Sequence, residues 1–140
     1  MNLLPTLLAL LVCTIAAIGS SRNLNRTYAR LEGEIRSQDD LLIVREVINL
    51  SMLQAFILIM AEAFWVIGFL IAIYFGFLRR GDILIHGGTF AGGLTLIVAY
   101  AKPIEKRFRG LKANPLKPEI GETFARWKKE WREPRIRLSE

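Results

Sequence analysis

Cysteine and histidine are almost absent from this sequence of 140 residues, which contains one of each, Cys13 and His86. One cysteine cannot form a disulfide within the chain, and one histidine without a cysteine cluster does not match the spacing of a zinc site. The sequence also lacks a glycine-rich phosphate-binding motif, a nucleophile elbow and the paired carboxylates of an acid–base site. Because the residue patterns that carry catalysis are missing, we expect no enzymatic activity.

Charged side chains are missing from three long stretches of the chain. Residues 1–19 and 83–101 carry none, and residues 48–78 carry only Glu62. About 20 apolar residues in an α-helix cross the hydrocarbon core of a bilayer, which is roughly 30 Å thick. The sequence therefore predicts an all-α membrane protein with three transmembrane helices, of which the second is long enough to protrude from the bilayer.

The first of these helices, residues 1–19, has no lysine or arginine ahead of its apolar run and no clear cleavage site after it. These features favour a retained helix over the alternative, a secretory signal peptide that is removed. Small residues share one face of the helix: Ala9, Cys13, Ala16 and Ser20. Such a face lets another helix approach closely, although alanine is also simply common in membrane helices.

Residues 20–47 are polar, but mostly apolar side chains recur within them at alternating steps of four and three. The members of this series are Leu24, Tyr28, Leu31, Ile35, Gln38 and Leu42. This spacing is typical of an amphipathic helical segment. We expect either a stalk that binds a partner or a linker that lies on lipid head groups, followed by a helix that begins at Asp39 or Asp40.

Residues 79–82, which comprise two arginines, a glycine and an aspartate, interrupt the apolar sequence and predict a turn. The third helix, residues 83–101, would then return antiparallel to the second. Four small residues share one of its faces: Gly88, Gly92, Thr95 and Ala99. We expect this face to be buried against another helix, by default the second helix and otherwise a second copy of the chain.

Residues 102–140 are strongly basic, since twelve of the 19 lysines and arginines of the chain lie there. Within this tail the spacing predicts an amphipathic helix at residues 119–133, with Phe124, Trp127 and Trp131 on its apolar face. Its other faces carry Lys128, Lys129 and Arg132. Indole rings and cations together are typical of the bilayer interface, so we expect this helix to lie on anionic lipids or on a partner protein. No nucleic-acid motif accompanies the charge, and we expect no nucleic acid as a partner.

The distribution of cations predicts an orientation in the membrane. Residues 20–47 carry five lysines and arginines and the tail carries twelve, whereas only Arg79 and Arg80 lie at the other end of the helices. Segments on the cytoplasmic side are enriched in these residues. We therefore expect an integral protein of a bacterial inner membrane or an organellar membrane, with its N-terminus outside and its C-terminus in the cytoplasm, matrix or stroma.

Two side chains are candidates for function. A carboxylate inside a membrane is costly, which makes Glu62 a functional candidate by default. We expect it to be a structural anchor held by Tyr100 or Lys102, and the alternative is that it lines an ion path. His86 is a candidate ligand for haem or a pigment, but its closeness to Asp82 favours the alternative, an interfacial histidine hydrogen-bonded to the turn or to water.

These features predict a small non-enzymatic subunit that supports the assembly of a larger membrane complex, respiratory, photosynthetic or viral. Its partners would be other membrane subunits and anionic lipids. The rival prediction is a homo-oligomeric ion channel or a holin-like pore that uses Glu62. A membrane-bound enzyme has the least support.

Overall fold

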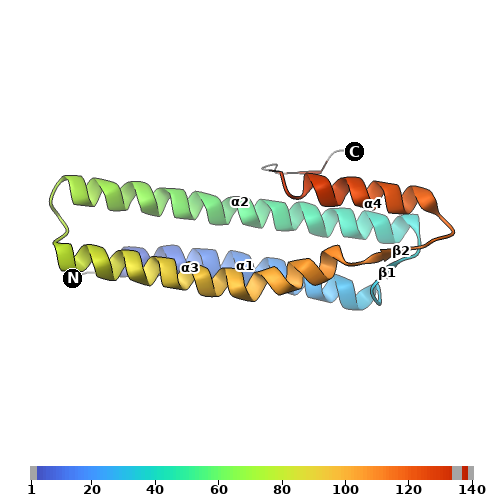
Figure 1. Cartoon of the computed structure of the whole chain (residues 1–140), viewed down its shortest axis with the longest axis horizontal. Coiled ribbons are helices and arrows are strands. Elements are labelled where there is room, and N and C mark those ends of the chain that lie inside the picture. Colours follow the sequence, from blue (N-terminus) through green and yellow to red (C-terminus); the bar gives the residue numbers. More distant parts are fainter. Residues whose placement is uncertain (1–2, 134–136, 139–140) are drawn as a thin grey trace.

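The computed structural model describes residues 3–133, 137 and 138. Within them the chain forms four helices and two short strands: α1 (Leu4–Arg30), β1 (Glu34–Ile35), α2 (Gln38–Tyr74), α3 (Arg80–Arg109), β2 (Lys112–Ala113) and α4 (Pro118–Glu130). The first three helices lie alongside one another in an elongated bundle, and α4 packs beside the first half of α2 (Figure 1). α1, α2 and α3 are long and apolar enough to cross a membrane, in agreement with the predicted helical architecture and the predicted number of such helices.

The predicted segment 20–47 is not a separate element. α1 continues through it as far as Arg30, and α2 already begins at Gln38. The backbone N–H of Asp40 donates a hydrogen bond to Ser37 Oγ at 3.1 Å, and Asp40 Oδ2 accepts one from the backbone N–H of Ser37 at 3.1 Å. This reciprocal cap satisfies donors that a helix leaves free at its start, so α2 begins slightly earlier than predicted.

The turn between α2 and α3 also lies earlier than predicted. Gly76, just beyond the end of α2, has a φ of +71°, a left-handed conformation that glycine adopts without strain. α3 begins at Arg80, inside the predicted turn 79–82. The carboxylate of Asp82 accepts a hydrogen bond from the backbone N–H of Arg79 at 3.3 Å and thereby caps this helix.

α3 runs beyond the predicted end at residue 101 and contains Pro103 in its interior. A proline there removes one helical hydrogen bond and costs about 3 kcal/mol. Ile104 and Phe108, which follow it, pack in the apolar core, and their burial offsets this cost. The basic connector therefore begins only after Arg109.

α1 is the central helix of the bundle, because it packs against both α2 and α3. α2 and α3 run antiparallel, but their backbones do not make extensive contact (Figure 1). The expectation that the small-residue face of the third helix is buried against the second helix therefore needs correction, because the backbone of α3 packs mainly on α1. The close approach occurs at Gly93, where an added Cβ would lie 2.6 Å from a methyl carbon of Leu10 on α1.

The polar end of the molecule contains an apolar core, which we call the core end. β1 and β2 pair in parallel there, with Glu34 opposite Lys112 and Ile35 opposite Ala113. The core draws side chains from the end of α1, the start of α2, the end of α3 and α4, among them Leu24, Ile35, Val44, Ile48, Phe108, Ile120 and Phe124. Each large apolar side chain buried in this way contributes about 1.5–3 kcal/mol, which is what holds the short helix α4 in place.

The aromatic face of α4 is covered by the chain itself. Phe124, Trp127 and Trp131 are 2%, 4% and 8% exposed and belong to the core. The expectation that these side chains lie on lipid or on a partner protein needs correction, although the spacing does correspond to a helix with one buried face. An amphipathic helix covers whatever apolar surface is nearest, and here that surface is the core end.

Candidate functional site

One buried polar contact joins the three long helices close to the turn between α2 and α3. The indole N–H of Trp65 on α2 donates a hydrogen bond to Thr6 Oγ1 on α1 at 3.1 Å. The same Thr6 oxygen lies 2.7 Å from Nδ1 of His86 on α3. Thr6 and His86 are 1% and 6% exposed. We call these three residues the polar clasp.

The chemistry of threonine explains how one side chain serves two partners. An indole N–H can only donate, so it occupies one lone pair of the Thr6 oxygen. The remaining hydroxyl proton or the second lone pair then pairs with His86 Nδ1, according to the tautomer of the imidazole. Because buried polar groups without a partner are costly, this contact favours one relative position of the three helices.

Stacked aromatic rings surround the polar clasp. The Trp65 indole stacks on Phe90 of α3, with ring centroids 3.8 Å apart, and on Phe69 of α2, at 4.7 Å. The Phe69 ring in turn lies 6.4 Å from the His86 ring. Trp65 therefore faces Phe90 while Phe69 faces His86, which defines how α2 and α3 are aligned.

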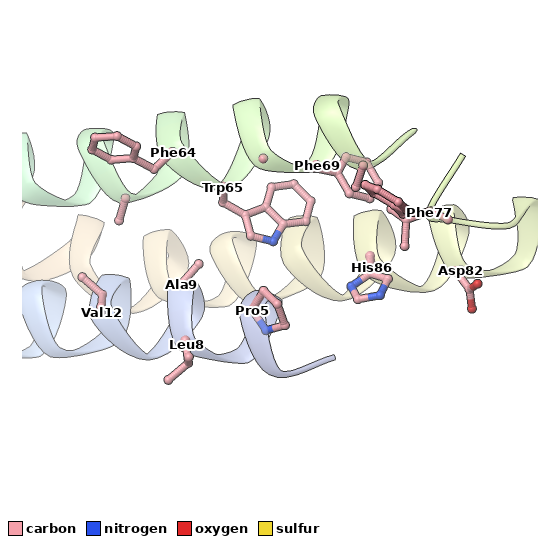
Figure 2. Close-up of a pocket in the computed structure, with 14 residues that line it drawn as sticks. Pro5, Leu8, Ala9, Val12, Phe64, Trp65, Phe69, Phe77, Asp82 and His86 are labelled. Carbon is pink, nitrogen blue, oxygen red and sulfur yellow. The ribbon is translucent and has the colours of Figure 1, made fainter. Parts of the chain in front are cut away.

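A groove of about 740 Å³ opens beside the polar clasp, between α1 and α2, and His86 and Asp82 of α3 lie at one end of it (Figure 2). Its other lining residues are mostly apolar or aromatic, among them Pro5, Leu8, Val12, Phe64, Trp65, Phe69 and Phe77. Since Nδ1 of His86 is hydrogen-bonded to Thr6, Nε2 is the ring nitrogen that could bind a haem iron or a pigment metal. Among the described residues, no group of three or more His, Cys, Asp and Glu side chains could hold a metal ion.

The sequence singled out His86 but neither of its partners. The favoured expectation, a histidine hydrogen-bonded to the turn or to water, needs correction because His86 is buried and its partner is a residue of α1. Thr6 is one of two threonines in an otherwise apolar run, and Trp65 is the one tryptophan in the three apolar stretches. These two features are the sequence signals that could have pointed to Thr6 and Trp65. Pairing them requires the relative positions of three helices, which spacing within one helix does not contain.

The predicted anchor of Glu62, Tyr100 and Lys102 is not formed. Glu62 is half-buried, and no ion pair or hydrogen bond involves it in the part of the chain that the structure describes. The alignment of Trp65 with Phe90 places Glu62 level with about residue 93, so Tyr100 lies roughly 10 Å further along α3. The earlier turn between α2 and α3 accounts for this difference.

The two predicted packing faces have different surroundings. On α1, Cys13 and Ala16 are buried and Ala9 is half-buried, and Ser20 Oγ forms a hydrogen bond of 2.7 Å with Ser51 Oγ of α2. On α3, the face formed by Gly88, Gly92, Thr95 and Ala99 is exposed. An added Cβ at either of its glycines would meet no atom within 4 Å. Within one chain this second face is therefore uncovered, contrary to the default expectation.

Two of the three cations predicted to bind lipid, on α4 and just after it, lie on the surface. Lys129 and Arg132 are exposed, whereas the Lys128 ammonium lies 4.8 Å from the centre of the Phe124 ring. Lys129 and Arg132 are therefore on the surface while the three aromatic side chains are buried, and only Lys128 keeps a contact with one of these rings. Contact of α4 with a lipid surface would be electrostatic only.

The fold and these contacts define a class: a mostly helical chain with three helices of membrane-crossing length and a compact apolar core at one end. Comparison of the chain with family models, curated proteins and solved structures gave no match. Inference about function therefore depends on the geometry of the residues.

Proposed function

We propose that the chain is an integral membrane protein whose α1, α2 and α3 cross the bilayer, with the N-terminus outside and the core end in the cytoplasm, matrix or stroma. Large exposed apolar side chains support insertion: Phe64, Leu70 and Leu96 are 74%, 59% and 74% exposed. A patch of this kind is unfavourable in water but matches lipid. The basic residues of segment 20–47 and of the tail gather at the core end, as the positive-inside rule requires for that orientation.

Cysteine labelling in cells tests this orientation. Single cysteines introduced as Arg79→Cys at the turn and Glu122→Cys on α4 would be exposed to solvent, whereas the native Cys13 is buried. A membrane-impermeant maleimide should label Arg79→Cys in intact cells and Glu122→Cys only after permeabilisation. The reverse pattern would invert the orientation, and equal labelling of both in intact cells would contradict three crossings.

Within the membrane, we propose that the chain is a non-enzymatic structural subunit that supports the assembly of a larger complex. The observation that carries this proposal is the uncovered Gly88 and Gly92 face of α3, because small residues let a neighbouring helix approach closely. The most apolar 18-residue stretch of α2 contains no residue buried by the rest of the chain, and it would face lipid or a neighbouring subunit. The compact core end would hold these surfaces in a defined arrangement.

Purification in a mild detergent tests the assembly role. A tagged chain should co-purify in fixed ratio with other membrane polypeptides. Gly92→Leu should reduce that ratio without unfolding the chain, because its side chain enters open space within one copy, whereas the control Leu94→Ile should leave it unchanged. Equal behaviour of the two variants would remove the α3 face from the interface, and a chain that always purifies alone would contradict the subunit proposal.

A homo-oligomeric channel is the second candidate, and the lack of an ion pair at Glu62 in the described part of the chain favours it. Such a channel would run as a multiple of 15.9 kDa in detergent and pass ions in liposomes. Glu62→Gln should abolish this flux, with Glu122→Gln, at an exposed position of α4, as a control that makes the same charge change. Flux that survives Glu62→Gln would exclude this mechanism.

A further inference from the structure

A second cavity, of about 820 Å³, lies where the bundle meets the core end. α1 contributes Ala16, Ala17 and Ser20 to its lining. α2 and α3 form its two walls, and the space between them is open because their backbones make no extensive contact. Trp131, Arg132 and Glu133, which follow α4, border the cavity at the core end.

The lining of this cleft changes character along its length. Towards the bundle it is apolar, with Ala55, Ile59, Ile97, Val98 and Ala101, and the uncharged polar residues Ser20, Ser51 and Gln54 lie nearer the core end. Towards the core end it carries Glu105 and Arg109 of α3, then Arg132 and Glu133 beyond α4. Charged groups therefore occur at one end only.

Two buried polar atoms in this lining, Arg109 Nε and Gln54 Oε1, have no hydrogen-bond partner among the described residues. The guanidinium of Arg109 is held in place, because Nη2 donates to the Glu105 carboxylate and the group lies 4.7 Å from the centre of the Trp131 ring. The Arg109 side chain is still 23% exposed, so the accessible edge of this fixed guanidinium is suited to a phosphate oxygen. Arg132 is exposed at the same mouth and makes no ion pair within the described residues.

We infer that this cleft binds one glycerophospholipid, with its phosphate at Arg109 and Arg132 and an acyl chain between α2 and α3. The inference rests on the proposed membrane location. A bilayer must fill an open apolar gap between two helices, because water is unfavourable there and an empty space loses its dispersion contacts. An occupant that is apolar over most of its length complements the apolar part of this lining, and an anionic end would meet Arg109 and Arg132 beside the carboxylates of Glu105 and Glu133.

Native mass spectrometry of the full-length chain, delipidated in detergent, tests the inference. The probes are dioleoyl phosphatidylglycerol, dioleoyl phosphatidylethanolamine and dioleoylglycerol, which share their acyl chains and differ in the phosphate. We expect one tightly bound phospholipid per chain, and binding of dioleoylglycerol that is weaker by about fivefold or more, the effect of one cation acting on a lipid phosphate. Equal binding of dioleoylglycerol would overturn the role of the phosphate, and the absence of any retained lipid would overturn the site.

Matched variants locate the lipid. Arg132→Gln should weaken phospholipid binding about fivefold, whereas Lys129→Gln, the same charge change at an exposed position of α4 outside the cleft, should not. Ala101→Phe should fill the space proposed for the acyl chain and weaken lipid binding, whereas Ala99→Phe on the exposed face of α3 should leave lipid binding unchanged. Thermal unfolding identifies any variant that fails to fold, and Arg132 is exposed, so its substitution leaves the core intact.

If Arg132→Gln binds phospholipid as tightly as Lys129→Gln, the cleft is not the binding site. Occupation of the cleft by another polypeptide, seen as a cross-link from Ala101→Cys to a second chain in the intact membrane, would also overturn the inference. Lipid binding to the isolated chain does not depend on co-purifying subunits. Failure of the assembly proposal and failure of this one therefore give different results.

Discussion

The core end and the bundle are held together in different ways. At the core end, Phe108, Ile120 and Phe124 are at most 2% exposed and pack on one another. In the bundle, side chains of the same types, such as Phe64 and Leu96, are 74% exposed. The long helices meet instead through Gly93, the stacked rings and the polar clasp. Apolar burial stabilises a structure only against water, so in lipid close backbone approach and polar contacts must take its place.

The largest difference between the two regions should appear at phenylalanine. Phe124→Ala removes a ring that is 2% exposed and should lower the free energy of unfolding by about 3–5 kcal/mol. Phe64→Ala, at a position 74% exposed, should change it by less than about 0.5 kcal/mol. Denaturant unfolding in detergent micelles, followed by circular dichroism, measures both. Equal effects would mean that the two regions are stabilised alike.

Adjacent glycines on α3 provide the next comparison. Gly93→Ala places a Cβ within 2.6 Å of Leu10 and should destabilise the contact of α1 with α3 by about 1–3 kcal/mol. Gly92→Ala enters open space and should stabilise the helix by up to about 1 kcal/mol, because alanine has the higher helix propensity. The midpoint of thermal unfolding in detergent should therefore fall in Gly93→Ala and rise in Gly92→Ala. A shift of both midpoints in the same direction would contradict the packing of α3 on α1.

A smaller effect is expected at the polar clasp. Thr6→Val keeps the shape of the side chain but removes the oxygen that pairs with Trp65 and His86, and should cost about 1–2 kcal/mol. Thr95→Val is the control, because the Thr95 hydroxyl donates only to the Ala91 carbonyl of its own helix. His86 is the one histidine in the chain, so its imidazole nitrogens give a single pair of NMR signals. Their chemical shifts should change in Thr6→Val and stay constant in Thr95→Val.

The smallest effect is expected at the surface pair of Arg36 and Glu32, whose side chains are 56% and 70% exposed. Arg36→Gln should leave the unfolding transition unchanged, since exposed ion pairs add little. The hydrogen bond to Glu32 raises the pKa of Arg36, so stabilisation from the guanidinium would be lost only as the pH rises through that pKa, far above neutrality. The free energy of unfolding, measured as a function of pH around neutrality, should therefore show no step caused by Arg36. A step in this pH range that is present in the native chain and absent in Arg36→Gln would contradict this prediction.

Different parts of the candidate site were predictable to different degrees. His86 and Glu62 could be selected from the sequence, because a polar or charged side chain within an apolar stretch is unusual and must find a partner. Their surroundings could not. A shift of the turn by a few residues moved Glu62 away from Tyr100, because each residue advances a helix by about 1.5 Å. The hydrogen bond between Thr6 and His86 joins residues 80 positions apart, and no local periodicity encodes that separation.

The sequence by itself determined the helical class, the three apolar stretches of membrane-crossing length and the apolar face of α4, because each depends on side chains repeated within a single helix. Only the tertiary structure decided which surfaces meet: α1 packs against both α2 and α3, α4 covers the core end instead of an outside surface, and the Gly88 and Gly92 face stays open. The physical reason is that an apolar stripe or a row of small residues allows a helix to pack but does not specify which other helix it packs against. The partner is chosen by the relative positions of several helices, which depend on turn lengths, caps and long-range polar contacts together.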